Sequence, residues 1–205
     1  MALLTDAEKQ QVADAIARVE RHTDAELVTV LAPQADDYLY ISILWAALIA
    51  LIVPGVIHYI TGWWGANQLL TIQWGLFIVL ALLFRIPKLL MLLVPKSVRY
   101  WRACNLAKSQ FLANNLHHTD GDTGILIFVS EAERYVEIIV DRGIAQHFPD
   151  DTWQAIIDTF VSRVRAGQTL EGFVQCIESC GLLLREKVPA THERNELPNH
   201  LIVLE

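Results

Sequence analysis

The stretch with the residue types most suited to chemistry is His-His-Thr-Asp-Gly-Asp-Thr-Gly, residues 117–124. A further acidic residue, Asp141, follows the run of residues 134–140 and begins the sequence Asp141-Arg142-Gly143. If the turn between strands over residues 124–129 and 134–140 centres near residue 132, antiparallel pairing places residue 123 opposite residue 141. Asp120, Asp122 and Asp141 are then expected to meet at one end of a sheet.

Carboxylates brought together repel, so such a group retains a proton or binds a cation. Oxygen ligands at a loop-rich end of a sheet suit Ca²⁺ or Mg²⁺, which makes Asp120, Asp122 and Asp141 candidate metal ligands. Glu26 joins them if its strand, expected over residues 25–31, runs parallel to residues 124–129. The competing interpretation is a solvated turn, in which Asp caps backbone amides and Gly supplies positive φ.

Basic side chains flank these acids. Arg142 is a candidate for bidentate contact with a phosphate, and a salt bridge with a neighbouring acid is the competing interpretation. His117 and His118 suit the C-terminal end of a helix, where cations interact favourably with the helix dipole. The sequence contains no Gly-rich phosphate loop, no nucleophile elbow and no His-Glu-x-x-His helix, so no catalytic residue is assigned.

The elements that must position these residues alternate between helix and strand. Thr5 to Glu8 forms a capping box that begins a helix reaching about residue 22. Further helices are predicted over residues 98–116, 150–165 (capped by Asp150 or Asp151) and 169–186, and residues 200–204 can add an edge strand. This order predicts an α/β fold with a small mixed sheet flanked by helices. Residues 1–37 and 96–188 must fold together, followed by a tail over residues 189–205.

An uncharged stretch interrupts this domain. No Asp, Glu, Lys or Arg occurs from residue 38 to residue 84. Residues 39–60 as a helix measure about 33 Å, enough to cross a bilayer core. Residues 69–84 are shorter and must borrow from residues 63–68 or 86–94, and a re-entrant segment is the alternative to a tilted or kinked helix. We predict a two-helix transmembrane hairpin with an interfacial segment over residues 38–95.

The distribution of charge predicts an orientation. Residues 61–68 carry no Lys or Arg but include Trp63 and Trp64. This composition is expected at the membrane–water interface on the side away from the cytoplasm. Residues 85–119 contain no acid and six basic residues: Arg85, Lys88, Lys96, Arg99, Arg102 and Lys108. With no signal peptide at the N-terminus, we expect a multi-pass protein of the inner (plasma) membrane, with both soluble segments and both termini cytoplasmic. The partners expected are the lipid bilayer and a membrane protein. Nucleic acid is not expected, because the basic residues lie beside the hydrophobic stretch, where they suit anionic lipid head groups better. The oligomeric state stays open.

The soluble elements resemble the TPM-domain family, in a membrane-inserted bacterial form. The resemblance rests on residues 4–8, 23–27, 122–128 and 134–140, on the helical pair joined by residues 166–172, and on Asn195-Glu-Leu-Pro-Asn199. It implies an α/β sandwich whose acidic site falls on Asp122 and, less directly, on Asp120 and Glu26. Some members are described as acid-phosphatase-like and calcium-binding, and others act in photosystem repair or as receptor accessory subunits.

This chain departs from the family where Val140-Asp-Arg-Gly143 replaces a Gly-rich stretch. A cytoplasmic position, where calcium is scarce, also argues against a calcium role. Two functions are therefore carried forward. The first is a membrane-anchored, non-catalytic accessory module that binds a partner. The alternative is a weak phosphomonoester hydrolase that uses a divalent metal.

Overall fold

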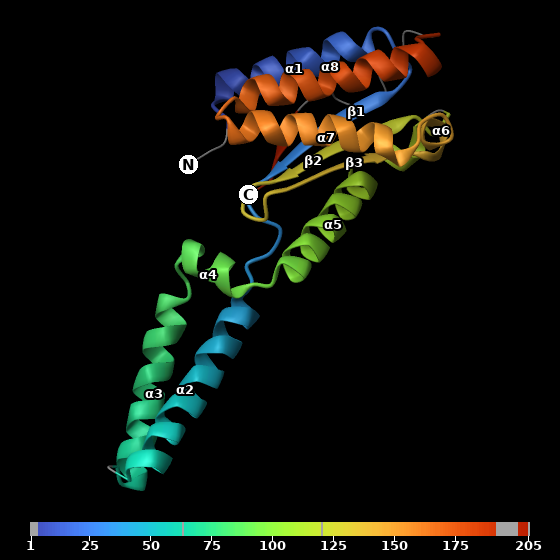
Figure 1. Cartoon of the computed structure of the whole chain (residues 1–205). Coiled ribbons are helices and arrows are strands. Elements are labelled where there is room, and N and C mark those ends of the chain that lie inside the picture. Colours follow the sequence, from blue (N-terminus) through green and yellow to red (C-terminus); the bar gives the residue numbers. More distant parts are fainter. Residues whose placement is uncertain (1–3, 63, 120, 192–200, 205) are drawn as a thin grey trace. The chain divides into compact units, whose positions relative to one another are not determined.

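The computed structural model describes residues 4–62, 64–119, 121–191 and 201–204 (Figure 1). It divides into two compact units. Residues Met1–Ala35 and Trp101–Glu205 form one unit, here called the α/β unit, and residues Asp36–Tyr100 form the other, here called the hairpin unit. The chain therefore leaves the α/β unit after its first strand and returns to it within α5.

The α/β unit contains one four-stranded mixed sheet in the order β3-β2-β1-β4. Its strands are β1 (Glu26–Ala32), β2 (Gly124–Ser130), β3 (Tyr135–Val140) and β4 (Leu201–Val203). β1 is parallel to both β2 and β4, whereas β2 and β3 are antiparallel. The helices are α1 (Asp6–Glu20), α5 (Lys96–Ala113), η1 (Leu116–His118), α6 (Arg142–Ala145), α7 (Asp150–Arg165) and α8 (Thr169–Lys187). The predicted α/β class, a small mixed sheet flanked by helices, is confirmed.

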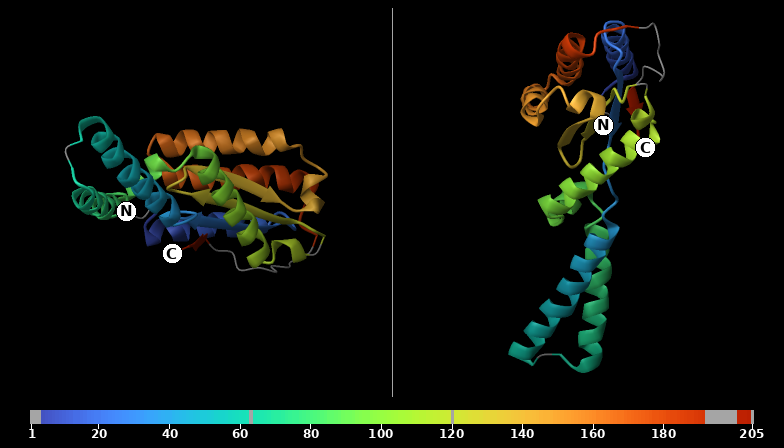
Figure 2. Two further views of the ribbon diagram at one scale, coloured as in Figure 1. Left: turned by 90° about the horizontal axis from the view of Figure 1, so that it is seen from below. Right: turned by 90° about the vertical axis from the view of Figure 1, so that its right-hand side faces the viewer.

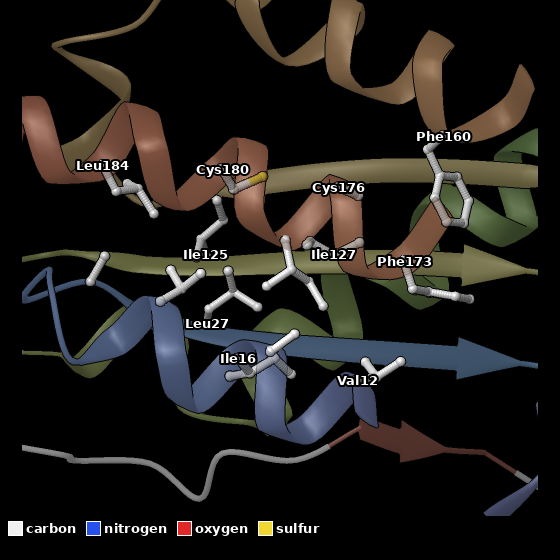
Figure 3. Close-up of a cluster of buried hydrophobic side chains, with 14 of the residues drawn as sticks. Val12, Ile16, Leu27, Ile125, Ile127, Phe160, Phe173, Cys176, Cys180 and Leu184 are labelled. Atoms are coloured by element: carbon white, nitrogen blue, oxygen red, sulfur yellow. The ribbon is translucent and has the colours of Figure 1, made fainter. Parts of the chain in front are cut away.

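Each face of the sheet is covered by helices, which explains why every residue of β1 and β2 is buried. Side chains alternate along a strand, so Leu27, Ile125 and Ile127 point to one face, where they pack with α1, α7 and α8 (Figure 3). Val28 and Leu126 point to the other face, where α5 lies (Figure 2). Because both of their faces are buried, the two central strands have nearly continuous apolar sequences.

Several local predictions can be compared with the structure. The capping box is present, with Thr5 as N-cap of α1 and hydrogen bonds in both directions between Thr5 and Glu8. The predicted edge strand forms as β4 on the free edge of β1. The predicted cap of α7 is wrong, because Pro149 occupies the N-cap position and α7 begins at Asp150. The short helices η1 and α6 were not predicted.

The hairpin unit contains α2 (Leu39–Thr61), α3 (Ala66–Leu83) and α4 (Pro87–Leu93). α2 and α3 are each long and apolar enough to cross a membrane. The second candidate span, α3, extends at its N-terminal side to Ala66, and Pro87 begins the separate helix α4. α2 and α3 pack together, and the Gln73 amide donates to the carbonyl of Leu51 at 3.3 Å. Small buried residues at a four-residue spacing on α2, Ser42, Ala46 and Ala50, suit such close helix packing.

Candidate functional site: the acidic end of the sheet

Two acidic residues flank Gly124, the first residue of β2. Glu26 pairs with Gly124 in the parallel ladder of β1 and β2, which satisfies the condition set for including Glu26. On the other side, the Asp141 amide donates to the Gly124 carbonyl at 2.9 Å. We use the name acidic end for Glu26, Asp122, Asp141 and the loops of residues 117–123 and 141–147.

The predicted pairing of residues 123 and 141 is wrong by one residue. Ile125 pairs with Val140, so the ladder carries Gly124, and not Thr123, to the position opposite Asp141. The turn between the strands spans residues 131–134 and ends at Arg134, which has a φ of 53°. This left-handed residue places the centre of the turn between residues 132 and 133, half a residue later than expected.

A close contact between two loops holds Asp122 and Asp141 at the same end of the sheet. The Gly143 amide donates to the Asp122 carbonyl at 2.9 Å. A Cβ atom at Gly143 would lie 2.2 Å from the carbonyl oxygen of Gly121, so only glycine permits this approach. Asp122 itself has a φ of 55°, a conformation that Asp tolerates better than most residues. Gly143, two residues after Asp141, therefore joins the two acidic loops.

Glu26 and Asp141 occupy positions on the same face of the sheet, because both lie opposite Gly124. Two strand spacings separate their backbones by about 10 Å. The backbone of Leu116 fills the space over Gly124, where a Cβ atom would lie 2.1 Å from the Leu116 carbonyl oxygen. Leu116, the first residue of η1, therefore lies over Gly124, between the backbone positions of Glu26 and Asp141. Within the residues that the structure describes, no group of three Asp, Glu, His or Cys side chains is arranged to hold a metal ion.

Asp141 is the acid whose surroundings are best defined. It is 9% exposed, and its Oδ1 accepts a hydrogen bond from the Arg142 amide at 2.7 Å, which caps α6. Its Oδ2 is buried and has no hydrogen-bond partner in the described part of the chain. A buried carboxylate oxygen without a donor is costly unless a proton or a cation reaches it. This oxygen is the feature of the acidic end that best fits a cation.

The other predicted site residues are placed as follows. Asp120 lies outside the described residues. Arg142 is exposed at the first position of α6, and no ion pair joins it to another described residue, so the expected salt bridge is not formed there and its phosphate role stays a prediction. His117 and His118 lie in η1 with ring centroids 4.0 Å apart, and the longer helix α5 ends before them at Ala113.

The sequence reasoning missed Glu20, at the end of α1. Its Oε1 accepts a hydrogen bond from the Leu27 amide at 2.9 Å, next to Glu26 in β1. Burial raises the pKa of Glu20 to about 8. The hydrogen bond from Leu27 opposes this rise, and the charge of Glu26 adds to it. Glu20 follows Ile16 by four residues, so it falls on the apolar stripe of α1. That position was the signal that it is buried.

Comparisons with known proteins find a TPM domain and one similar solved structure. The TPM domain model matches residues 89–181. A search of solved structures finds the NMR structure of BA42 protein from the psychrophilic bacterium Bizionia argentinensis, with a TM-score of 0.61 and 18% sequence identity. The match covers 98% of this chain and 94% of that one, and at this identity it shows a shared fold alone. No curated protein matches the chain. Residues 89–181 of the chain therefore match a TPM domain, and the chain shares the fold of BA42 protein.

Proposed function

We propose that this chain is a two-span membrane protein whose TPM domain faces the cytoplasm and binds a membrane-protein partner without catalysing a reaction. The observation that carries the proposal is the surface of α2 and α3. Leu51 is 64% exposed, Ile60 74% and Trp74 65%, and neither helix contains Asp, Glu, Lys or Arg. Water disfavours so much uncovered apolar surface, whereas the interior of a bilayer solvates it.

The proposed orientation rests on the distribution of basic residues. The segment between α2 and α3 has no Lys or Arg, whereas Arg85, Lys88, Lys96 and Arg99 follow α3 within about 16 residues. Such a bias retains the basic side in the cytoplasm. The termini and both soluble segments are then cytoplasmic, in the inner (plasma) membrane.

The non-catalytic role is supported by the chemistry of the acidic end. Its loops, residues 117–123 and 141–147, contain no Ser or Cys to act as a nucleophile. Leu116 lies over Gly124, between the backbone positions of Glu26 and Asp141, which does not favour a close acid–base pair of these two residues. We propose that Asp122 and Asp141 bind a divalent cation, Ca²⁺ or Mg²⁺, weakly, with the buried Oδ2 of Asp141 as its main ligand.

A second function, metal-assisted hydrolysis of a phosphomonoester, is favoured by one arrangement. Arg142 follows Asp141 directly in the chain and is exposed, so a phosphate could contact the guanidinium group near a cation held by Asp141. A bound divalent cation would neutralise phosphate charge and activate water. Asp141 and Asp122 would hold the cation, and Arg142 would orient the phosphate.

One experiment separates these functions. The full chain in lipid nanodiscs is titrated with Ca²⁺ and Mg²⁺ by calorimetry and assayed with p-nitrophenyl phosphate, as wild type, Asp141→Asn and Asp122→Asn, with Asp158→Asn on α7 as the matched control. We expect cation binding that both acidic-end variants weaken, and no turnover above an empty-nanodisc background. Cation-dependent turnover that is lost in Asp141→Asn and kept in Asp158→Asn would show that the protein is a hydrolase and contradict the non-catalytic role.

A further inference from the structure

A pocket of about 530 Å³ lies at the opposite end of the sheet from the acidic end, between the β2–β3 turn and the α7–α8 turn. Its floor is apolar and includes the core residues Phe160 and Phe173, which Figure 3 shows packed side by side. Three half-buried valines, Val136, Val161 and Val164, continue this floor toward the surface. The volume falls within the range of about 300–1,000 Å³ that is typical of small-molecule sites.

The rim of the pocket is polar and carries excess positive charge. Arg134 lines it from the β2–β3 turn, and Arg165 lines it from the last turn of α7. In the described part of the chain, neither guanidinium group forms an ion pair or a hydrogen bond. Glu131 also lines the rim, so the formal charge contributed by the three side chains is about +1.

The start of α8 adds donors to the same rim. Thr169, the first residue of α8, lines the pocket, and the N-cap residue Gln168 makes no side-chain hydrogen bond to the helix. The first amides of a helix have no acceptor within the helix, and the helix dipole favours an anion near them. The unpaired arginines and this helix end therefore favour the same ligand charge.

We propose that this pocket binds a monoanionic amphiphile, with a carboxylate or phosphodiester head group at Arg134 and Arg165 and its apolar chain on the valine and phenylalanine floor. One negative charge matches the rim, whereas a dianionic phosphomonoester would be repelled by Glu131. An uncharged apolar ligand would make no use of the two exposed guanidinium groups. All lining residues belong to the α/β unit, so the proposal does not depend on the membrane proposal above.

The test uses the full chain with ¹³C-labelled valine methyl groups, in nanodiscs of zwitterionic lipid, titrated with octanoate. We expect saturable shifts of the Val161 and Val164 methyl signals with a Kd of about 1 mM or tighter. Val12 and Val28, which lie in the two cores, serve as internal references. A parallel titration with dibutyl phosphate identifies the head group: preference for octanoate indicates a fatty-acid ligand, and equal or stronger binding of dibutyl phosphate indicates a phosphodiester lipid.

Charge-removing variants make the test specific. Arg165→Gln and, independently, Arg134→Gln should each weaken binding by about tenfold or more, because a charge-assisted hydrogen bond is lost. Arg185→Gln on α8, outside this pocket, should change binding by less than about twofold. The proposal is overturned if neither anion shifts Val161 and Val164, if octanol shifts them equally, or if both pocket variants bind like Arg185→Gln.

Discussion

Replacing Glu20 by Gln tests whether the fold contains a neutral carboxylic acid between α1 and β1. The Oε1 of Glu20 accepts from the Leu27 amide, and burial raises the pKa of this carboxyl to about 8 from an ordinary value of 4.5. A folded state that prefers the protonated acid loses stability when the acid ionises. Gln has nearly the same shape, keeps an acceptor for the Leu27 amide and cannot ionise.

The size of the effect follows from these two pKa values. Their difference corresponds to about 5 kcal/mol, and because Glu20 is partly exposed we expect about 2–4 kcal/mol. The folded-state pKa is raised, so the wild-type free energy of unfolding is unaffected by Glu20 below about pH 4.5. It then falls as pH rises from about 4.5 to about 8. Glu20→Gln should match the wild type near pH 4.5 and exceed it in stability by about 2–4 kcal/mol at pH 8.

The assay is urea unfolding of the full chain in a neutral detergent, followed by circular dichroism at several pH values. Using the difference between variant and wild type cancels the other titrating groups. Glu8→Gln is unsuitable as a control because Glu8 belongs to the capping box, whereas Glu171→Gln changes an exposed acid on α8. Parallel pH profiles for wild type and Glu20→Gln, or a less stable variant at pH 8, would refute the reasoning.

Two further substitutions test the loops at the two ends of the sheet. Gly143→Ala places a Cβ atom 2.2 Å from the Gly121 carbonyl oxygen and should lower the free energy of unfolding by about 2 kcal/mol or more. In Gly172→Ala on α8, the new Cβ atom would lie 3.5 Å from its nearest neighbours, so this control should raise the free energy of unfolding by about 0.5–1 kcal/mol. Equal effects of the two variants in urea unfolding would contradict the close approach of Gly143 to Gly121. Glu133 is 2% exposed and accepts hydrogen bonds from the Ala35 amide and the Ser130 hydroxyl. Glu133→Ala should therefore lower the free energy of unfolding by about 2–4 kcal/mol and speed proteolysis of residues 33–38, whereas Glu131→Ala, at an exposed neighbour, should change it by less than about 0.5 kcal/mol. Unchanged proteolysis in Glu133→Ala would show that this carboxylate does not hold the chain as it leaves β1.

Local signals in the sequence predicted most of the fold. The capping box at Thr5, the apolar runs that became β1 and β2, and the amphipathic pair α7 and α8 each depend on residues close together in the chain. The absence of charge from residue 38 to residue 84 predicted α2 and α3 for the same reason. Each of these signals lies within one short stretch of the sequence, so predicting them required no knowledge of distant contacts.

The details of the acidic end depend on distant contacts, and these were less accessible. The predicted register of β2 and β3 differs from the observed one by one residue. The turn between them ends at Arg134 in a left-handed conformation, which is uncommon for Arg and was not expected from its residue type. The position of Leu116 over Gly124 separates Glu26 from Asp141, and only the packing of η1 on the sheet reveals this. Glu20 was visible as a break in the apolar stripe of α1, although its contact with Leu27 was not.

The most direct test of the account is the topology of the chain in sealed, right-side-out membrane vesicles. Single cysteines are introduced at Asn67, in the first turn of α3, and at Glu171 on α8, after Cys104, Cys176 and Cys180 have been replaced by Ala. Both positions are exposed. We expect a membrane-impermeant maleimide to label Asn67→Cys in intact vesicles and to label Glu171→Cys only after detergent is added. Labelling of Glu171→Cys in intact vesicles, or protection of Asn67→Cys, would contradict a two-span protein with a cytoplasmic TPM domain.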